Sequence, residues 1–176
     1  MIKGIYIIIF VLTLKSCAFP QFSFKAGGKG GSEIPGKTIQ INYFENRSDL
    51  ASANASNFFT ESLKDLMQSQ TKLSLISDGA DWVIEGQINT YKVVPISIQA
   101  NSESAALNRF TMGVIANCKF IKPNGEDSLV IDNKQFTFYS DFESTLDFSA
   151  QEETLQEEVV EQITQAIFDN AFGGEW

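Results

Sequence analysis

Apolar and polar residues alternate along five segments of the chain, and a period of two predicts strands with one buried face. The segments are 38–44, 73–76, 82–93, 109–121 and 129–139. Pro95 is expected to interrupt the third segment, with alternation resuming over 96–100 and a polar loop over 101–105. Gly86 lies inside the third segment, where a glycine indicates either a bulge or close packing by a neighbour.

A hairpin is predicted between the last two strands. Residues 122–125 read Lys-Pro-Asn-Gly, and the Asn-Gly pair favours a tight turn. The apolar positions after the turn shift from Leu129 and Ile131 to Phe136 and Phe138. This change of parity predicts a bulge near 132–134.

Two segments show helical spacing instead. Residues 53–69 carry one apolar stripe, and a second stripe follows Ser149 and Glu152, which together predict a capping box. The stripes consist of Ala55, Phe59, Leu63, Leu66 and Met67, and of Leu155, Val159, Ile163 and Ile167. The predicted order is β-α-β-β-β-β-α. The predicted fold class is α+β, with two helices on one face of a largely antiparallel sheet of four or slightly more strands.

The first 16 residues read as an export signal. Lys3 is followed by an apolar stretch over 5–14, which is too short to span a bilayer and typical of a signal peptide. Leu14-Lys15-Ser16-Cys17 resembles the lipobox cut by lipoprotein signal peptidase. The alternative is an ordinary secretory signal that happens to contain a cysteine. Lipidation would place a diacylglycerol thioether and an N-acyl chain on Cys17, and several chains together anchor a protein firmly.

The segment after Cys17 predicts a tether and a destination. Residues 26–36 hold five glycines and one proline, which is typical of a flexible linker. The predicted organisation is a signal peptide (1–16), a lipidated N-terminus with a Gly-rich tether (17–36) and a folded domain (37–176). Ala18 replaces the Asp that typically retains such lipoproteins at the inner membrane, so the outer membrane is expected, on its periplasmic side.

Composition narrows the possible functions. The chain has no histidine and a net charge of −9, which becomes −11 without residues 1–16 and argues against nucleic-acid binding. Catalysis and metal sites that depend on histidine are excluded, and no cofactor is expected. Once Cys17 is lipidated, Cys118 has no disulfide partner and is expected to be a small buried hydrophobe. The carboxylate pairs 152–153 and 157–158 are expected to face solvent, so the chain is not expected to be an enzyme.

Four basic residues are candidate contacts for a lipid or a partner. Arg109 begins the long strand 109–121, where it either forms an ion pair at the rim or contacts an anionic headgroup or a partner loop. Lys119, Lys122 and Lys134 flank the predicted hairpin and could form a small cationic patch. Either set could equally belong to an ordinary solvated surface.

Several stretches along the chain together resemble the LptE family of lipopolysaccharide-assembly lipoproteins. No single stretch is a catalytic signature, and the resemblance rests on their order. They are Cys17 with FSFKAG (22–27), KTIQINYFENRS (37–48), FFTESLKDLMQSQTKLSL (58–75), EGQINTYKVVPI (85–96), AALNRFTMGV (105–114) and EEVVEQITQAIFDNAFGGEW (157–176).

The resemblance implies a role and a partner. LptE proteins plug the lumen of the outer-membrane β-barrel LptD and assist both its folding and the delivery of lipopolysaccharide to the outer leaflet. The implied fold, two helices on a four-stranded sheet, agrees with the pattern of the strands and helices. Only Cys17 carries over as a functional residue, and direct lipopolysaccharide binding stays open because the chain is acidic. A stand-alone periplasmic lipid carrier is the alternative, and it would need a deep apolar cavity.

Overall fold

The computed structural model describes residues 34–52, 54–100 and 103–173. The predicted signal peptide, Cys17 and most of the predicted tether therefore lie outside the described residues. The elements are β1 (Thr38–Ile41), β2 (Glu45–Asn46), α2 (Ala55–Gln70), β3 (Ser74–Leu75), β4 (Trp82–Ala100), β5 (Glu103–Ile121), β6 (Asp127–Glu143) and α3 (Phe148–Phe172).

The strands form one mixed sheet with the order β3-β1-β4-β5-β6, and β2 pairs with β4 beyond the end of β1. The long strands β4, β5 and β6 are antiparallel, whereas β1 runs parallel to both β3 and β4, and β2 runs parallel to β4. Parallel neighbours require a crossover, and α2 supplies it between β2 and β3. β2 was expected to be a polar connection; its two residues are exposed, so no burial pattern marked them as a strand.

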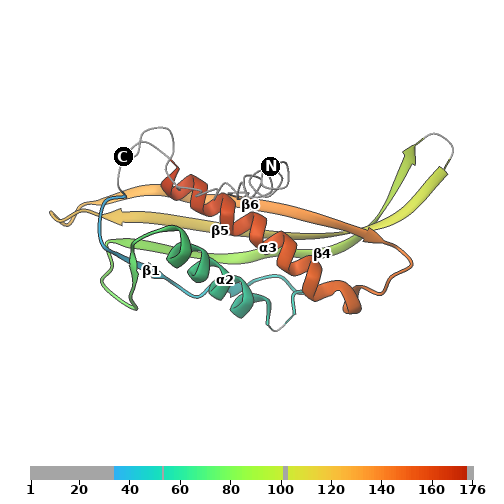
Figure 1. Ribbon diagram of the computed structural model, residues 1–176, viewed down its shortest axis with the longest axis horizontal. Coiled ribbons are helices and arrows are strands. Elements are labelled where there is room, and N and C mark those ends of the chain that lie inside the picture. Colours follow the sequence, from blue (N-terminus) through green and yellow to red (C-terminus); the bar gives the residue numbers. More distant parts are fainter. Residues whose placement is uncertain (1–33, 53, 101–102, 174–176) are drawn as a thin grey trace, which may run out of the picture.

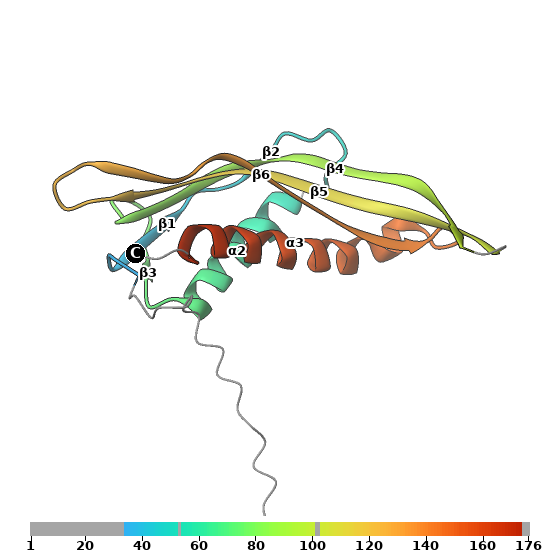
Figure 2. The same ribbon diagram turned by 90° about the horizontal axis from the view of Figure 1, so that it is seen from above.

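Both helices described by the structure cover the same face of the sheet, which confirms the predicted α+β fold class (Figures 1 and 2). α3 contacts β5 and β6, and it also packs beside α2. α2 in turn contacts the short strands β1, β2 and β3. The opposite face of β4, β5 and β6 carries no helix among the described residues (Figure 2).

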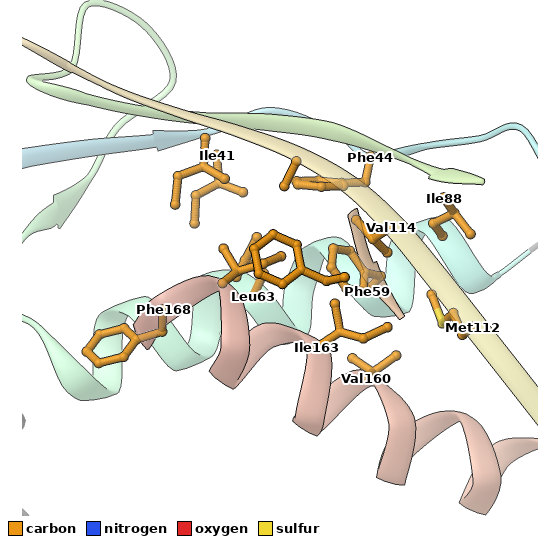
Figure 3. Close-up of a cluster of buried hydrophobic side chains, with 14 of the residues drawn as sticks. Ile41, Phe44, Phe59, Leu63, Ile88, Met112, Val114, Val160, Ile163 and Phe168 are labelled. Atoms are coloured by element: carbon orange, nitrogen blue, oxygen red, sulfur yellow. The ribbon is translucent and has the colours of Figure 1, made fainter. Parts of the chain in front are cut away.

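The hydrophobic core fills the space between the helices and the sheet (Figure 3). Phe59 and Leu63 of α2, Ile163 of α3 and Met112 of β5 all belong to this core, and all four side chains are fully buried. The apolar stripes of the helices thus face the side of the sheet that carries the even-numbered residues of β5. The helical period of 3.6 and the strand period of two predicted this arrangement. Burying each such side chain contributes roughly 1.5–3 kcal/mol, so this layer supplies much of the stability.

Gly86 permits an aromatic ring to lie directly on β4. A Cβ atom at this position would lie 2.4 Å from Phe44 Cε1 and 2.2 Å from the carbonyl oxygen of Ile115. Phe44 also packs against Phe59, with ring centroids 4.9 Å apart. Of the two predicted reasons for this glycine, close packing is therefore correct, and the irregularity in β4 lies between Ile88 and Thr90 instead.

β4 and β5 are longer than predicted. β4 continues through Pro95, which lies opposite Asn108, and the expected polar loop shrinks because β4 ends at Ala100 and β5 begins at Glu103. Proline is tolerated there because β1 and β2 pair with β4 only as far as Ile88, so beyond that point β4 is an edge strand among the described residues. The prediction that Pro95 interrupts the strand was therefore wrong.

The structure confirms the bulge predicted within β6 and corrects the cap predicted at the start of α3. The register between β5 and β6 shifts where Ala116 lies opposite Lys134 and Cys118 opposite Ile131, which confirms the bulge near 132–134. The capping box was wrong: α3 begins two residues earlier than it implied, and the Asp147 side chain caps the helix by accepting from the backbone N–H of Ser149. Aspartate favours this position for the same reason as serine, because its oxygen satisfies a free helix N–H.

Candidate partner-binding surface

The sheet face opposite the helices, which we call the open face, is left uncovered by the described elements. Side chains on β5 alternate, so Phe110, Met112 and Val114 are buried beneath the helices whereas Thr111 and Ile115 are half-buried on the other side. The open face is formed by Val83, Glu85, Gln87, Thr90, Lys92, Val94, Ile96, Leu107, Arg109, Thr111, Gly113, Ile115, Asn117, Lys119, Ile121, Asp127, Leu129, Gln135, Thr137, Tyr139, Asp141 and Glu143.

The two sides of the molecule differ in charge. The open face carries three basic and four acidic residues, together with amides, hydroxyls and apolar side chains. The helices α2 and α3 carry eight acidic residues and a single basic one, Lys64. An anionic headgroup is therefore repelled from the helix side, whereas the open face offers a mixed surface with little net charge.

Arg109 lies on the open face, where it forms an ion pair with Asp141 on the adjacent strand. Its Nε and Nη2 donate to the two carboxylate oxygens of Asp141 at 2.7 and 2.8 Å. Its guanidinium carbon also lies 3.7 Å from the centre of the Tyr139 ring. The hydrogen bonds to Arg109 lower the pKa of Asp141, and the same bonds raise the pKa of Arg109. Of the two readings of Arg109, the structure shows the ion pair; a contact with a lipid or partner stays a prediction.

The three candidate lysines do not share one surface. Lys119 lies on the open face opposite Leu129, and Lys122 is exposed in the turn that joins β5 to β6. Lys134 instead lies on the helix side, where its Nζ donates to the Asn170 side chain in α3. A single cationic patch would require all three on one face, so only Lys119 and Lys122 remain as neighbours.

A clamp that sequence patterns did not reveal holds the start of β1 against the start of β4. Asp81 Oδ2 accepts hydrogen bonds from the backbone N–H groups of Lys37 and Thr38 at 2.7 and 3.1 Å. These bonds, led by the one from Lys37, lower the pKa of Asp81. The Trp82 indole N–H donates to the Pro35 carbonyl at 2.7 Å. The last residues of the predicted tether are thus attached to the folded domain.

Glu152 is the one member of the carboxylate pairs that departs from the predicted solvent-facing position. It accepts a hydrogen bond from the buried hydroxyl of Tyr91 in β4. Burial, followed by this bond to Glu152, raises the pKa of Tyr91 above its ordinary value. Glu153, Glu157 and Glu158 are exposed, as expected, although Glu158 accepts from the Ser140 hydroxyl at 2.6 Å. These contacts join α3 to the sheet.

Reactive and metal-binding groups are scarce in the part of the chain that the structure describes. Cys118 is fully buried, and its burial raises the pKa of the thiol to about 12, as expected of a small core hydrophobe. No group of three or more acidic, cysteine or histidine side chains among the described residues is placed to hold a metal ion. No described helix is both long and apolar enough to cross a membrane.

Comparison with known proteins identifies the family. The profile of the LptE lipopolysaccharide-assembly family matches residues 36–171, which is most of the chain. The chain belongs to the LptE family. This confirms the predicted family, and with it a non-enzymatic role in lipopolysaccharide assembly as an outer-membrane lipoprotein. The matched region spans every described strand, all of α2 and α3 up to its penultimate residue.

Solved structures share the fold of this LptE-family chain. A hypothetical protein from Chlamydia trachomatis is 12% identical, with a TM-score of 0.52 over 79% of this chain and 99% of that one. A protein from Xanthomonas campestris is 10% identical, with a TM-score of 0.52 over 84% of this chain and 89% of that one. At these identities the likeness concerns the fold alone. No curated protein matches the sequence.

Proposed function

We propose that this chain is the lipoprotein subunit of the outer-membrane lipopolysaccharide translocon, in which it plugs the LptD-type β-barrel and assists its assembly. The observation that carries the proposal is the LptE profile across residues 36–171. Cys17 is the proposed anchor, carrying a diacylglycerol and an N-acyl chain, and the folded domain lies on the periplasmic side or within the barrel lumen.

The shape and surface of the folded domain support this placement. β4 has 19 residues, so at about 3.3 Å per residue it extends roughly 60 Å along the long axis of the molecule (Figure 1). The lumen of a large outer-membrane barrel is polar and water-filled. The open face carries amides, hydroxyls and nearly balanced charges, so it is suited to such a wall because its polar groups can exchange hydrogen bonds with it.

The packing of the helices weighs against the alternative of a stand-alone lipid carrier. A carrier would need an apolar cavity large enough for acyl chains. Here the side chains of α2, α3 and the sheet meet directly, and Phe59, Leu63, Ile163 and Met112 fill the centre (Figure 3). The helices therefore serve to cover the sheet rather than to enclose a ligand.

Depletion of the chain from the cells that make it tests the proposal. We expect the amount of correctly assembled barrel to fall, together with lipopolysaccharide newly exposed at the cell surface. Restoring the wild-type chain should recover both quantities. Normal barrel assembly and normal surface lipopolysaccharide after complete depletion would contradict the proposed function, whereas a general loss of unrelated barrels would point to an indirect effect and also count against it.

A further inference from the structure

β6 forms an edge of the sheet along all of its 17 residues (Figure 1). Within the described part of the chain it pairs with β5 on one side only. An edge strand presents a row of backbone N–H and C=O groups that can pair with another strand. The direction of these groups along β6 follows from the register.

The odd-numbered residues in the second half of β6 direct their backbone groups away from the sheet. Ser144 N–H donates to the Ala106 carbonyl at 3.2 Å, and the same register continues back along β6 to residue 134. Hydrogen-bonded and non-hydrogen-bonded pairs alternate in antiparallel strands, so even-numbered residues bond to β5. The backbone groups of Gln135, Thr137 and Tyr139 therefore point outward, and no hydrogen bond between described residues uses them.

This part of the edge lacks the features that usually prevent strand pairing. Residues 135–140 read Gln-Phe-Thr-Phe-Tyr-Ser, with no charge, no proline and no glycine. Natural edge strands are usually protected by lysine, proline or a bulge. The part of β4 without a described neighbour carries both Lys92 and Pro95, whereas β6 has its bulge and the charged Asp141 only at the two ends of this run. One short strand therefore fits between them.

A segment with a complementary pattern precedes the described domain. Residues 21–25 read Gln-Phe-Ser-Phe-Lys, in which aromatic and polar residues alternate, and this period of two predicts a short strand. The segment lies outside the described residues. In a tether surrounded by water, Phe22 and Phe24 would expose their rings, which is unfavourable. Pairing with an edge strand offers them both backbone partners and an apolar surface.

We propose that residues 21–25 pair antiparallel with residues 135–139 of the same chain, with Ser23 opposite Thr137. The outward-pointing backbone groups of β6 bond to this added strand, and Ser23 and Thr137 exchange both of their backbone hydrogen bonds. Serine and threonine opposite each other are also a favourable cross-strand pair. The edge is then closed within a single copy of the chain.

This register places aromatic rings side by side on the helix side of the sheet. Phe22 lies opposite Phe138 and Phe24 lies opposite Phe136, in non-hydrogen-bonded pairs, where side chains are closest. Phe136 is buried, and Phe138 packs partly buried against the core on the side that α3 covers. Aromatic pairs across strands are stabilising, so the added rings extend the apolar layer beyond β6. A register shifted by one residue would turn both rings to the open face.

The connection is long enough for this pairing. The Trp82 indole N–H donates to the Pro35 carbonyl at 2.7 Å, and the Trp82 and Phe172 ring centroids lie 4.8 Å apart. The chain therefore enters the described domain beside the last turn of α3. Three strand spacings and five residues along β4 separate this point from the position opposite Gln135, which is roughly 22 Å. The nine residue steps between the added strand and the described domain reach about 30 Å.

Charge complementarity favours this segment over a second copy or an acidic strand. α3 carries six acidic residues and no basic one. Residues 17–33 hold Lys25 and Lys29 against a single acid, Glu33. The connection passes the C-terminal end of α3, where a positive charge also interacts favourably with the helix dipole. The added strand thus brings a net positive segment to the acidic side of the domain.

The pairing changes how the predicted anchor is attached. Only residues 18–20 then separate Cys17 from the added strand, so the lipidated end is held beside β6 rather than at the end of a long tether. Residues 26–33 become a return loop, for which a glycine-rich composition is suited. The pairing lies within one chain, so it stands or fails independently of the barrel partnership.

Disulfide trapping in the mature chain, purified from membranes in mild detergent, tests the pairing and its register. Opposed residues in a hydrogen-bonded pair have Cα atoms about 5.5 Å apart, which a disulfide can span. Ser23→Cys with Thr137→Cys should therefore close an intramolecular disulfide in most chains under mild oxidation. Peptide mapping identifies the linked residues, and the buried Cys118 is the same in every variant.

Two matched pairs serve as controls. Ser23→Cys with Thr111→Cys tests random collision, since Thr111 lies on the same open face in the middle of the sheet. Ser23→Cys with Tyr139→Cys tests the register, because these two residues are two positions out of alignment. Both pairs should yield at least about fivefold less disulfide, because their Cα atoms lie farther apart than a disulfide spans.

The same experiment contains the results that would overturn the proposal. One is a yield for Ser23 with Thr137 that is no greater than the yield for either control. Others are a disulfide that joins two chains, and Thr137→Cys alone joined to another protein, because the edge would then have a different occupant. Circular dichroism of each variant establishes that it is folded.

Hydrogen exchange tests the pairing without any disulfide. The added strand accepts from the backbone N–H groups of Thr137 and Tyr139, so these should exchange slowly in the wild-type chain. Phe22→Ser combined with Phe24→Ser should accelerate their exchange by roughly tenfold or more, and should leave the N–H of Phe138, which bonds to β5, unchanged. Equal acceleration at all three N–H groups, or none at any, would contradict the pairing.

Discussion

The Tyr91 hydroxyl in β4 donates a hydrogen bond at 2.5 Å to the carboxylate of Glu152, the fifth residue of α3. Tyr91 is only 3% exposed, so its hydroxyl depends on partners within the protein. The bond joins the start of α3 to the sheet beside the irregularity between Ile88 and Thr90. With the Ser140–Glu158 and Lys134–Asn170 contacts, it adds a polar connection to an interface held mainly by apolar side chains.

Tyr91→Phe should lower the free energy of unfolding by about 2 kcal/mol, because a hydrogen bond to a charged group is lost and Glu152 stays partly buried. Urea unfolding of the folded domain measures this change. Tyr43→Phe serves as the control, since Tyr43 is 53% exposed, and it should have little effect. Equal losses for the two variants would show that the Tyr91 bond contributes nothing specific.

Asp81→Ala should reduce stability in a pH-dependent manner, because its carboxylate accepts backbone hydrogen bonds from Lys37 and Thr38. The folded protein lowers the pKa of Asp81, so its contribution is present above the unfolded pKa of about 4 and is lost as the pH falls through the folded pKa. The wild type should therefore exceed the variant by about 1–2 kcal/mol at neutral pH.

That difference between the wild type and Asp81→Ala should shrink as the pH falls below the unfolded pKa of about 4 and continue to shrink as the pH falls through the lower folded pKa. Urea unfolding across this pH range measures it. Asp78→Ala in the neighbouring exposed turn is the control and should leave the acid dependence unchanged. A constant difference at all pH values would indicate that Asp81 acts through packing rather than through its charge.

Gly86→Ala should destabilise the fold by at least about 3 kcal/mol, at the upper end of the cost of overpacking. The new Cβ would lie 2.2 Å from a backbone carbonyl, which cannot move as a flexible side chain can. Gly79→Ala is a useful comparison, because nothing lies within 4 Å of its Cβ position and only its positive φ of 72° costs energy. That cost is about 1 kcal/mol, so similar losses at the two glycines would contradict the packing argument.

The Arg109–Asp141 pair should show measurable coupling in a double-mutant cycle. Alanine at either position or both should give a coupling energy of about 0.5–1 kcal/mol that falls at high salt, since the side chains are only partly exposed. The same cycle at Arg47 and Glu45, which are 63% and 62% exposed, should give almost none. Equal coupling in the two cycles would mean that the two-bond geometry at Arg109 adds nothing.

Periodicity was sufficient to predict both described helices, the layer arrangement and five of the six described strands, because burial of one face repeats along these elements. It failed where a single contact decides the outcome. Pro95 looked like an interruption, because the sequence does not show that β1 and β2 end their pairing with β4 at Ile88. Ser149 and Asp147 were both suitable caps, and only the position of the first turn distinguishes them.

The candidate surface was less predictable because it depends on which face each residue occupies. Lys134 lies near Lys119 and Lys122 in sequence, but the bulge in β6 shifts its parity and directs it to α3. The Asp81 clamp joins residues more than forty positions apart through side-chain-to-backbone bonds, which leave no periodic signal. Cys17 differs from these residues because a local motif alone predicts its role. The residue itself lies outside the described residues.

Co-purification of the barrel with this chain tests the central claim most directly. A tag at the C-terminus of the full-length chain, followed by solubilisation of membranes in mild detergent, should recover an LptD-type barrel in near-equal amount. Cys17→Ala should leave the chain outside the membrane fraction and reduce the recovered barrel, whereas Cys118→Ala should change neither. A wild-type chain that elutes from solubilised membranes as a monomer with no barrel would contradict the account.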